Sequence, residues 1–78
     1  MTGRRGGCTA REVTRALQRA GFTVIRQTSA HCFLRKPGSR AVCVPVHPGR
    51  TLPTGTLGRI LRQSGMTAEE FEQWQRKG

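Results

Sequence analysis

Few side chains in this sequence could act as a general acid or base, namely two histidines and four glutamates. An imidazole has an ordinary pKa of about 6.5, so much of it is neutral at cytosolic pH and can accept a proton. Cleavage of RNA needs one such base and no metal, because the 2′-hydroxyl already lies beside the phosphorus atom that it attacks. His31 could supply this base, or it could be an ordinary surface residue of a strand.

Other kinds of catalytic site have little support in the sequence. Three of the four acids fall in residues 66–78, which argues against the paired carboxylates of a two-metal nuclease. The chain contains no aspartate, which argues against a Ser-His-Asp hydrolase. His47 follows Val-Pro-Val and falls on the opposite side-chain phase from His31, so we expect it to have a structural or RNA-contacting role. We expect no cofactor and no metal.

The three cysteines form no Cys-x-x-Cys pair, which argues against a disulfide framework and a structural zinc site. In a reducing compartment they are expected to be thiols. No apolar run has the length of a signal peptide core or a membrane span, and we therefore expect a cytoplasmic protein.

The charge of the chain is strongly positive, with 14 Lys and Arg against four acids and a formal net charge of +10. This composition is typical of a nucleic-acid-binding protein. It also fits a chain that adheres to any polyanion, or a small protein that acts only with an acidic partner. A chain of 78 residues has a small core, so we expect any site to lie on the surface, where a polymer can reach it.

The domain organisation is simple. Residues 1–8 are expected to form a flexible basic leader, and residues 9–76 a single domain. Thr9-Ala10-Arg11-Glu12 has the spacing of a capping box, and the apolar residues that follow predict a helix that closes at Gly21. The arginines at positions 11, 15 and 19 fall on the opposite face of this helix, where they could be solvated or contact RNA.

Three strands are predicted next, at residues 22–26, 31–36 and 40–46. Pro37-Gly38 fits the central positions of a type II turn, which would pair Lys36 with Ser39. In that register Cys32 lies opposite Cys43, where the two thiols would pack together. Pro45 indicates that the third strand is an edge strand or ends there.

The predicted register also divides the hairpin into two faces. The bulkier set is expected to turn toward the helices: Phe33, Val42, Val44 and Val46. In this register His31 and Arg35 share that face. The other set would form a modest exposed patch: Cys32, Leu34 and Cys43.

Two more helices are predicted after the strands. Thr54 is expected to cap the first, which Gly65 ends. Thr67-Ala68-Glu69-Glu70 is a second capping box, and the short helix after it would dock through Phe71 and Trp74. The order of helix, three antiparallel strands, helix and helix predicts an α+β fold with the helices on one face of the sheet.

Several strings in this chain resemble the HicA family of bacterial toxins over about residues 9–73. They are Ala20-Gly21-Phe22, Arg26-Gln27, His31, Val44-Pro45-Val46-His47, Gly55-Thr56-Leu57 and Ile60-Leu61-Arg62-Gln63. The resemblance implies a fold like the double-stranded RNA-binding domain, a ribonuclease that cleaves messenger RNA, and a HicB antitoxin as partner. The catalytic histidine of the family follows Gly-Ser or Gly-Gly, which falls here on Ser29-Ala30-His31, so His31 inherits the catalytic role by position.

The resemblance and the charge together suggest which residues contact RNA. The candidate phosphate contacts are Arg26, Arg35, Arg50, Arg59 and Arg62. The free backbone amides of Gly55 and Thr56, at the start of a helix, could also hold a phosphate. The alternative is a module of the same fold that binds RNA without cutting it, since Ser29-Ala30 differs from the usual motif.

Overall fold

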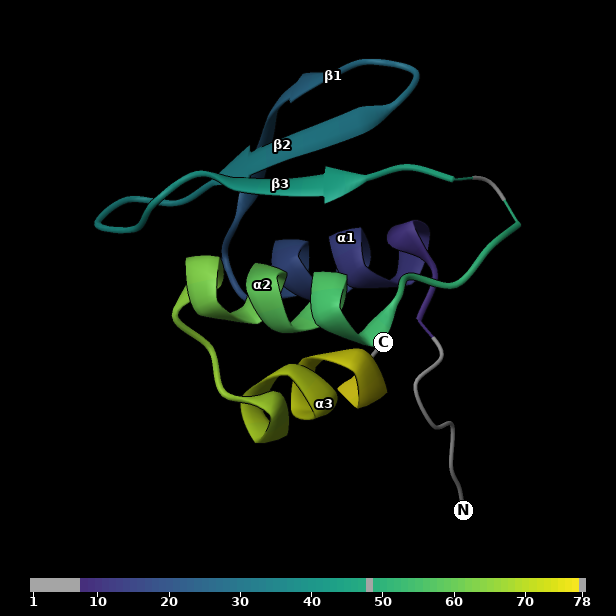
Figure 1. Ribbon diagram of the computed structural model, residues 1–78. Helices are drawn as coiled ribbons and strands as arrows, with labels where there is room; N and C mark the ends of the chain where they lie inside the picture. Colours follow the sequence, from purple (N-terminus) through teal and green to yellow (C-terminus); the bar gives the residue numbers. More distant parts are fainter. Residues whose placement is uncertain (1–7, 48, 78) are drawn as a thin grey trace.

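A three-stranded antiparallel sheet lies over three helices in the computed structural model, which describes residues 8–47 and 49–77 (Figure 1). The elements in chain order are α1 (Ala10–Arg19), β1 (Thr23–Gln27), β2 (His31–Arg35), β3 (Val42–Pro45), α2 (Thr54–Ser64) and α3 (Ala68–Lys77). The strand order is β1-β2-β3, so β2 is the central strand. The predicted α+β architecture, like that of the double-stranded RNA-binding domain, is confirmed.

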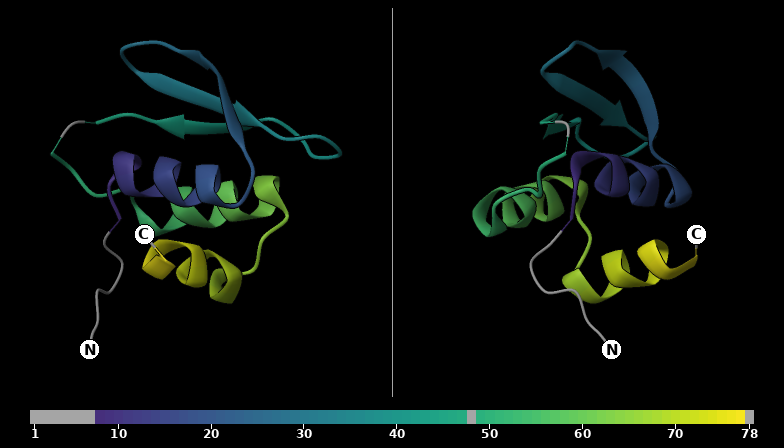
Figure 2. Two further views of the ribbon diagram at one scale, coloured as in Figure 1. Left: turned by 180° about the vertical axis from the view of Figure 1, so that it is seen from behind. Right: turned by 90° about the vertical axis from the view of Figure 1, so that its right-hand side faces the viewer.

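The helices lie on one side of the sheet (Figure 2). Helix α1 contacts β1 and β3, α2 contacts β3, and α3 packs against α1. The other side of the sheet has no helix over it in the described part of the chain. Among the described residues, none of the helices has the length and apolar composition that crossing a membrane requires.

Helix α1 begins as predicted. The Thr9 side chain accepts a hydrogen bond from the Glu12 peptide N–H, and the Glu12 carboxylate accepts one from the Thr9 N–H. Gly21, directly after the end of the helix, has a φ of +107°, a backbone conformation that residues other than glycine rarely adopt. Residues 1–7 lie outside the described residues, and Cys8, which we assigned to the leader, belongs to the core.

The hairpin of β2 and β3 has the predicted turn but not the predicted register. Ser39 N–H donates to the Lys36 carbonyl at 3.0 Å, and Gly38 has a φ of +80°, as a type II turn requires. The strands, however, pair Leu34 with Val42 and Cys32 with Val44, one residue away from the expected pairing. The loop is longer than predicted because Arg40 and Ala41 do not join the ladder.

This shift of one residue exchanges the faces of β2, so our prediction that His31, Phe33 and Arg35 turn toward the helices was wrong. The buried face carries Cys32, Leu34, Val42 and Val44, whereas Phe33 and Cys43 lie on the uncovered face. In the predicted register these four buried residues would have been divided between the two faces. The predicted packing of Cys32 against Cys43 is wrong for the same reason, because the two side chains leave the sheet on opposite sides.

The edge strands differ in how they are covered. Strand β3 ends at Pro45, as predicted. Strand β1 contains an irregularity between Val24 and Arg26, and Ile25, the extra residue there, is 56% exposed. Only Val24 of this strand is even half-buried, so β1 is loosely covered by the helices.

The C-terminal helices dock on α1 and β3. Helix α2 begins at Thr54 with Pro53 as its N-cap residue and without a side-chain cap, so the predicted Thr54 cap is wrong by one position. Gly65 ends α2 in the left-handed conformation, and the Thr67 and Glu70 capping box opens α3, both as predicted. Phe71 is buried, and the Arg19 guanidinium donates a hydrogen bond of 3.0 Å to the carbonyl of Trp74.

Candidate nucleic-acid interface and catalytic residue

His31 is the first residue of the central strand, and its side chain is exposed. Two hydrogen bonds to Thr28, across the β1–β2 turn, hold the backbone of His31 in place. Its peptide N–H donates to the Thr28 hydroxyl at 3.0 Å, and its carbonyl accepts from the Thr28 N–H at 2.8 Å. An exposed imidazole on a fixed backbone is accessible to a polymer and has a defined position relative to the sheet.

Thr28 shapes the turn that presents His31. Its hydroxyl also accepts a hydrogen bond from the Ala30 N–H at 3.2 Å. No residue of the described chain other than glycine has a positive φ, so Ser29 occupies its position without backbone strain. The glycine that the HicA motif usually carries here is not required by the backbone of this turn. Our reading of the sequence missed Thr28, although a threonine three residues before a strand is a typical turn signal.

His31 lies on the side of the sheet that has no described helix over it. We call it the open face, and its side chains alternate with buried ones: Thr23, Arg26, His31, Phe33, Arg35, Cys43 and Pro45. The His31 and Phe33 rings are 6.1 Å apart between centroids and tilted by 36°. Arg26 pairs directly with Phe33 across β1 and β2. Phe33 was also missed, because the predicted register turned it toward the helices.

The structure places the predicted phosphate contacts at three locations. Arg26 and Arg35 are exposed and share the open face with His31. Gly55, Thr56, Arg59 and Arg62 belong to α2, which packs against the opposite side of the sheet. Arg50 is exposed in the connection between β3 and α2. An RNA strand on the open face would therefore meet Arg26 and Arg35 first.

The acids of the described chain lie away from the open face. Glu12 is on α1 and the other three are on α3, and two of the four accept hydrogen bonds in capping boxes. The open face thus carries cationic side chains and no carboxylate, which favours an anionic partner.

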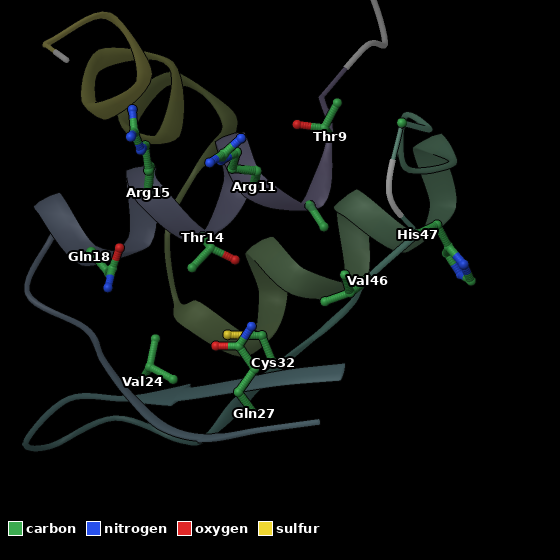
Figure 3. Close-up of a pocket in the computed structure, with 12 residues that line it drawn as sticks. Thr9, Arg11, Thr14, Arg15, Gln18, Val24, Gln27, Cys32, Val46 and His47 are labelled. Atoms are coloured by element: carbon green, nitrogen blue, oxygen red, sulfur yellow. The ribbon is translucent and has the colours of Figure 1, made fainter. Parts of the chain in front are cut away.

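A second feature lies on the helix side of the sheet, where a groove of about 620 Å³ separates α1 from β1 and β2 (Figure 3). Thr14 from α1 and Val24, Gln27 and Cys32 from the sheet point toward the space between them. His47 is at the far end and points outward. We expected any site to lie on the surface, and this groove is open at the surface, but no sequence pattern indicated that α1 and β1 would stand apart.

Arg11, Arg15 and Arg19 of α1 have two different surroundings. Arg11 and Arg15 are exposed at the rim of the groove, whereas Arg19 is half-buried and bonded to α3. The predicted arginine stripe is therefore available to a ligand only at its first two positions.

Comparison with protein families gives one match. The family described as the HicA toxin of bacterial toxin–antitoxin systems matches residues 10–66, which include α1, the sheet and α2. The chain belongs to the HicA toxin family. It is thus a toxin of a toxin–antitoxin system, and an antitoxin is its partner. A search of curated proteins finds no matching sequence. Within the HicA match, His31 opens the central strand and the α1–β1 groove lies directly behind it.

Proposed function

We propose that this HicA protein is a metal-independent endoribonuclease that cleaves messenger RNA in the cytoplasm with His31 as its catalytic residue. The observation that supports this proposal best is the exposed imidazole of His31 on a fixed backbone, on a sheet face that carries Arg26 and Arg35 and no carboxylate. The family match supports the toxin class independently of this geometry.

The proposed reaction is an internal displacement at phosphorus. The neutral imidazole of His31 accepts the proton of a ribose 2′-hydroxyl, and the 2′-oxygen forms a bond to the adjacent phosphorus. The bond from phosphorus to the 5′-oxygen of the next nucleotide then breaks, and that oxygen takes a proton from water. The products are a 2′,3′-cyclic phosphate and a free 5′-hydroxyl. Negative charge that develops on the phosphate oxygens is offset by the guanidinium group of Arg26.

The direct test is to incubate the purified protein with a long messenger RNA in EDTA and to separate the products on a gel. Gln73→Ala is the control, because Gln73 is exposed on α3, away from the open face. We expect the parent and Gln73→Ala to cut RNA at the same rate, and His31→Ala to be slower by about 100-fold or more, the usual contribution of a general base.

Each other result has a defined meaning. Cleavage by His31→Ala at the parent rate would contradict the catalytic role of His31. If neither the parent nor His31→Ala cuts the RNA, and both shift it on a native gel in a salt-sensitive way, the protein is an RNA-binding module of the same fold.

We further propose that the antitoxin is of the HicB type and neutralises the toxin by covering the open face. The arginines there suit acidic residues of a partner, and the Phe33 ring suits apolar residues of the same partner. Such a partner would exclude RNA from His31 without changing the fold of the toxin.

A further inference from the structure

The α1–β1 groove is not used by the cleavage reaction proposed above, yet its lining has a distinctive composition. Its volume of about 620 Å³ is within the range of about 300–1,000 Å³ that is typical of sites for small organic groups. Apolar walls are provided by Val24 from β1 and Val46 after β3. A groove of this size can hold a planar group of the size of a nucleobase.

Apart from two arginines, His47 and the Cys32 thiol, the polar side chains of the groove are two amides and two hydroxyls. Gln18 of α1 and Gln27 of β1 both line it, and both are exposed. Within the part of the chain that the structure describes, neither side-chain amide has a hydrogen-bond partner in the protein. A carboxamide offers both a donor and an acceptor, which is the pattern that the edge of a nucleobase requires.

The charges at the rim have one sign. Arg11 and Arg15 lie along the α1 side of the groove, and none of its lining residues is a glutamate. Guanidinium groups beside a pocket with neutral amides suit a ligand that combines a phosphate with an uncharged polar ring. A nucleotide unit of RNA has both parts.

The groove and His31 are joined through the end of the sheet. Cys32, which lines the groove, follows His31 in β2 and points to the opposite side. Gln27 pairs with Cys32 across the sheet. In the sequence, the turn residues 28–30 connect Gln27 to His31. An RNA strand that passes over this turn would thus have one nucleotide at His31 and an adjacent one at the groove.

We propose that the α1–β1 groove binds one unstacked base of single-stranded RNA next to the cleaved phosphodiester, with Gln18 and Gln27 contacting the base edge and Arg11 and Arg15 the backbone. This inference rests on the proposed ribonuclease function and adds to it a site that selects the sequence to be cut. Recognition of RNA sequence usually acts on unpaired bases, because the base edges of an RNA duplex are poorly accessible.

The main test is to cleave a pool of RNA with random sequence and to determine the bases on both sides of each cut. We expect the parent to prefer one base at one position beside the cut. Gln18→Ala and Gln27→Ala are each expected to reduce this preference about tenfold, the usual effect of losing one base contact. Gln73→Ala is the matched control, because Gln73 is an exposed glutamine on α3 away from the groove, and it should retain the preference.

A second measurement tests base binding by the groove separately from RNA cleavage. In a His31→Ala background, fluorescence anisotropy gives the affinity for short labelled RNAs that contain or lack the preferred base. We expect Gln27→Ala to reduce the affinity only for the RNA with that base. If the parent does not cut RNA, the same assay with four RNAs that differ in one base identifies a preferred base by affinity. A loss of affinity in Gln27→Ala only for the RNA with that base would then mean that the cleavage proposal is wrong and the base site stands.

Three results would overturn the base site. The first is a parent enzyme without any base preference, and the second is an unchanged preference in both groove variants. The third is an unchanged RNA profile together with weaker binding of the antitoxin by Gln18→Ala and Gln27→Ala, which would assign the groove to the protein partner. Thermal melting of each variant should match the parent, because both glutamines are exposed.

Discussion

His31 and Cys32 are neighbours in β2 with opposite surroundings. The side chains of a strand alternate between the two faces of its sheet, so the exposed imidazole of His31 is on the open face and the buried thiol of Cys32 faces the helices. One short strand therefore contributes to both candidate sites. A change in its register would move both residues to the wrong side at the same time, which couples the geometry of the two sites to the β2–β3 pairing.

The stability of the protein should depend on the thiol of Cys32 at alkaline pH. Burial raises the pKa of the Cys32 thiol, although a hydrogen bond from Thr14 acts in the opposite direction. Above about pH 9, the ordinary value, the unfolded chain has lost this proton while the folded protein retains it, so the free energy of unfolding falls as pH rises. Urea unfolding of Cys32→Ala at pH 8 and pH 10 should show a smaller fall than that of the parent.

Cys43→Ala is the comparison for this measurement, because Cys43 is only half-buried on the open face but its charge also raises the pKa of Cys32. It should retain most of the alkaline fall of the parent, because burial is the larger cause of the raised Cys32 pKa. An equal fall in the parent and in Cys32→Ala would show that other groups, such as the lysines, account for the pH dependence.

At the scale of the elements, local sequence signals predicted the starts of α1 and α3 and the hairpin turn. They did not predict the register in which β2 pairs with β3. The two capping boxes and the Pro37-Gly38 turn depend on residues within four positions of one another, and the structure contains all three. The register of β2 and β3 depends on which apolar residues can share one core, and a turn motif does not determine that. An uncovered face of the sheet was predicted, but the residues on that face and the groove follow from the register and from how α1 packs on β1, so neither of these was predicted.

A long-range hydrogen bond between α1 and α3 distinguishes Arg19 from its neighbours on α1. The Arg19 guanidinium donates to the Trp74 carbonyl at 3.0 Å in a partly buried position. Arg19→Ala should lower the free energy of unfolding by about 1–2 kcal/mol, because hydrogen bonds from charged donors contribute about this much. Arg15→Ala, on the same helix but exposed, should change it by less than about 0.5 kcal/mol. Equal effects of the two substitutions in urea unfolding would contradict this role of Arg19.

At the scale of the whole molecule, the net charge of +10 is unevenly distributed over the fold. The described acids lie on α1 and α3, whereas the sheet and α2 contain arginines and no acid. The open face is thus a cationic surface with the rings of His31 and Phe33, and RNA and an acidic antitoxin would compete for it. A toxin can be neutralised in this way without any change in its own structure.

Competition for the open face can be measured through Cys43, which is half-buried there opposite Phe33. If a purified HicB-type antitoxin covers this face, it should slow the alkylation of Cys43 by N-ethylmaleimide by about tenfold or more, because the reagent must wait for dissociation of the complex. Cys32 is buried behind the sheet and serves as the internal reference, with mass spectrometry of the two peptides giving both rates. An unchanged rate at Cys43 in a complex that no longer cuts RNA would show that the antitoxin inhibits from another surface, such as α2.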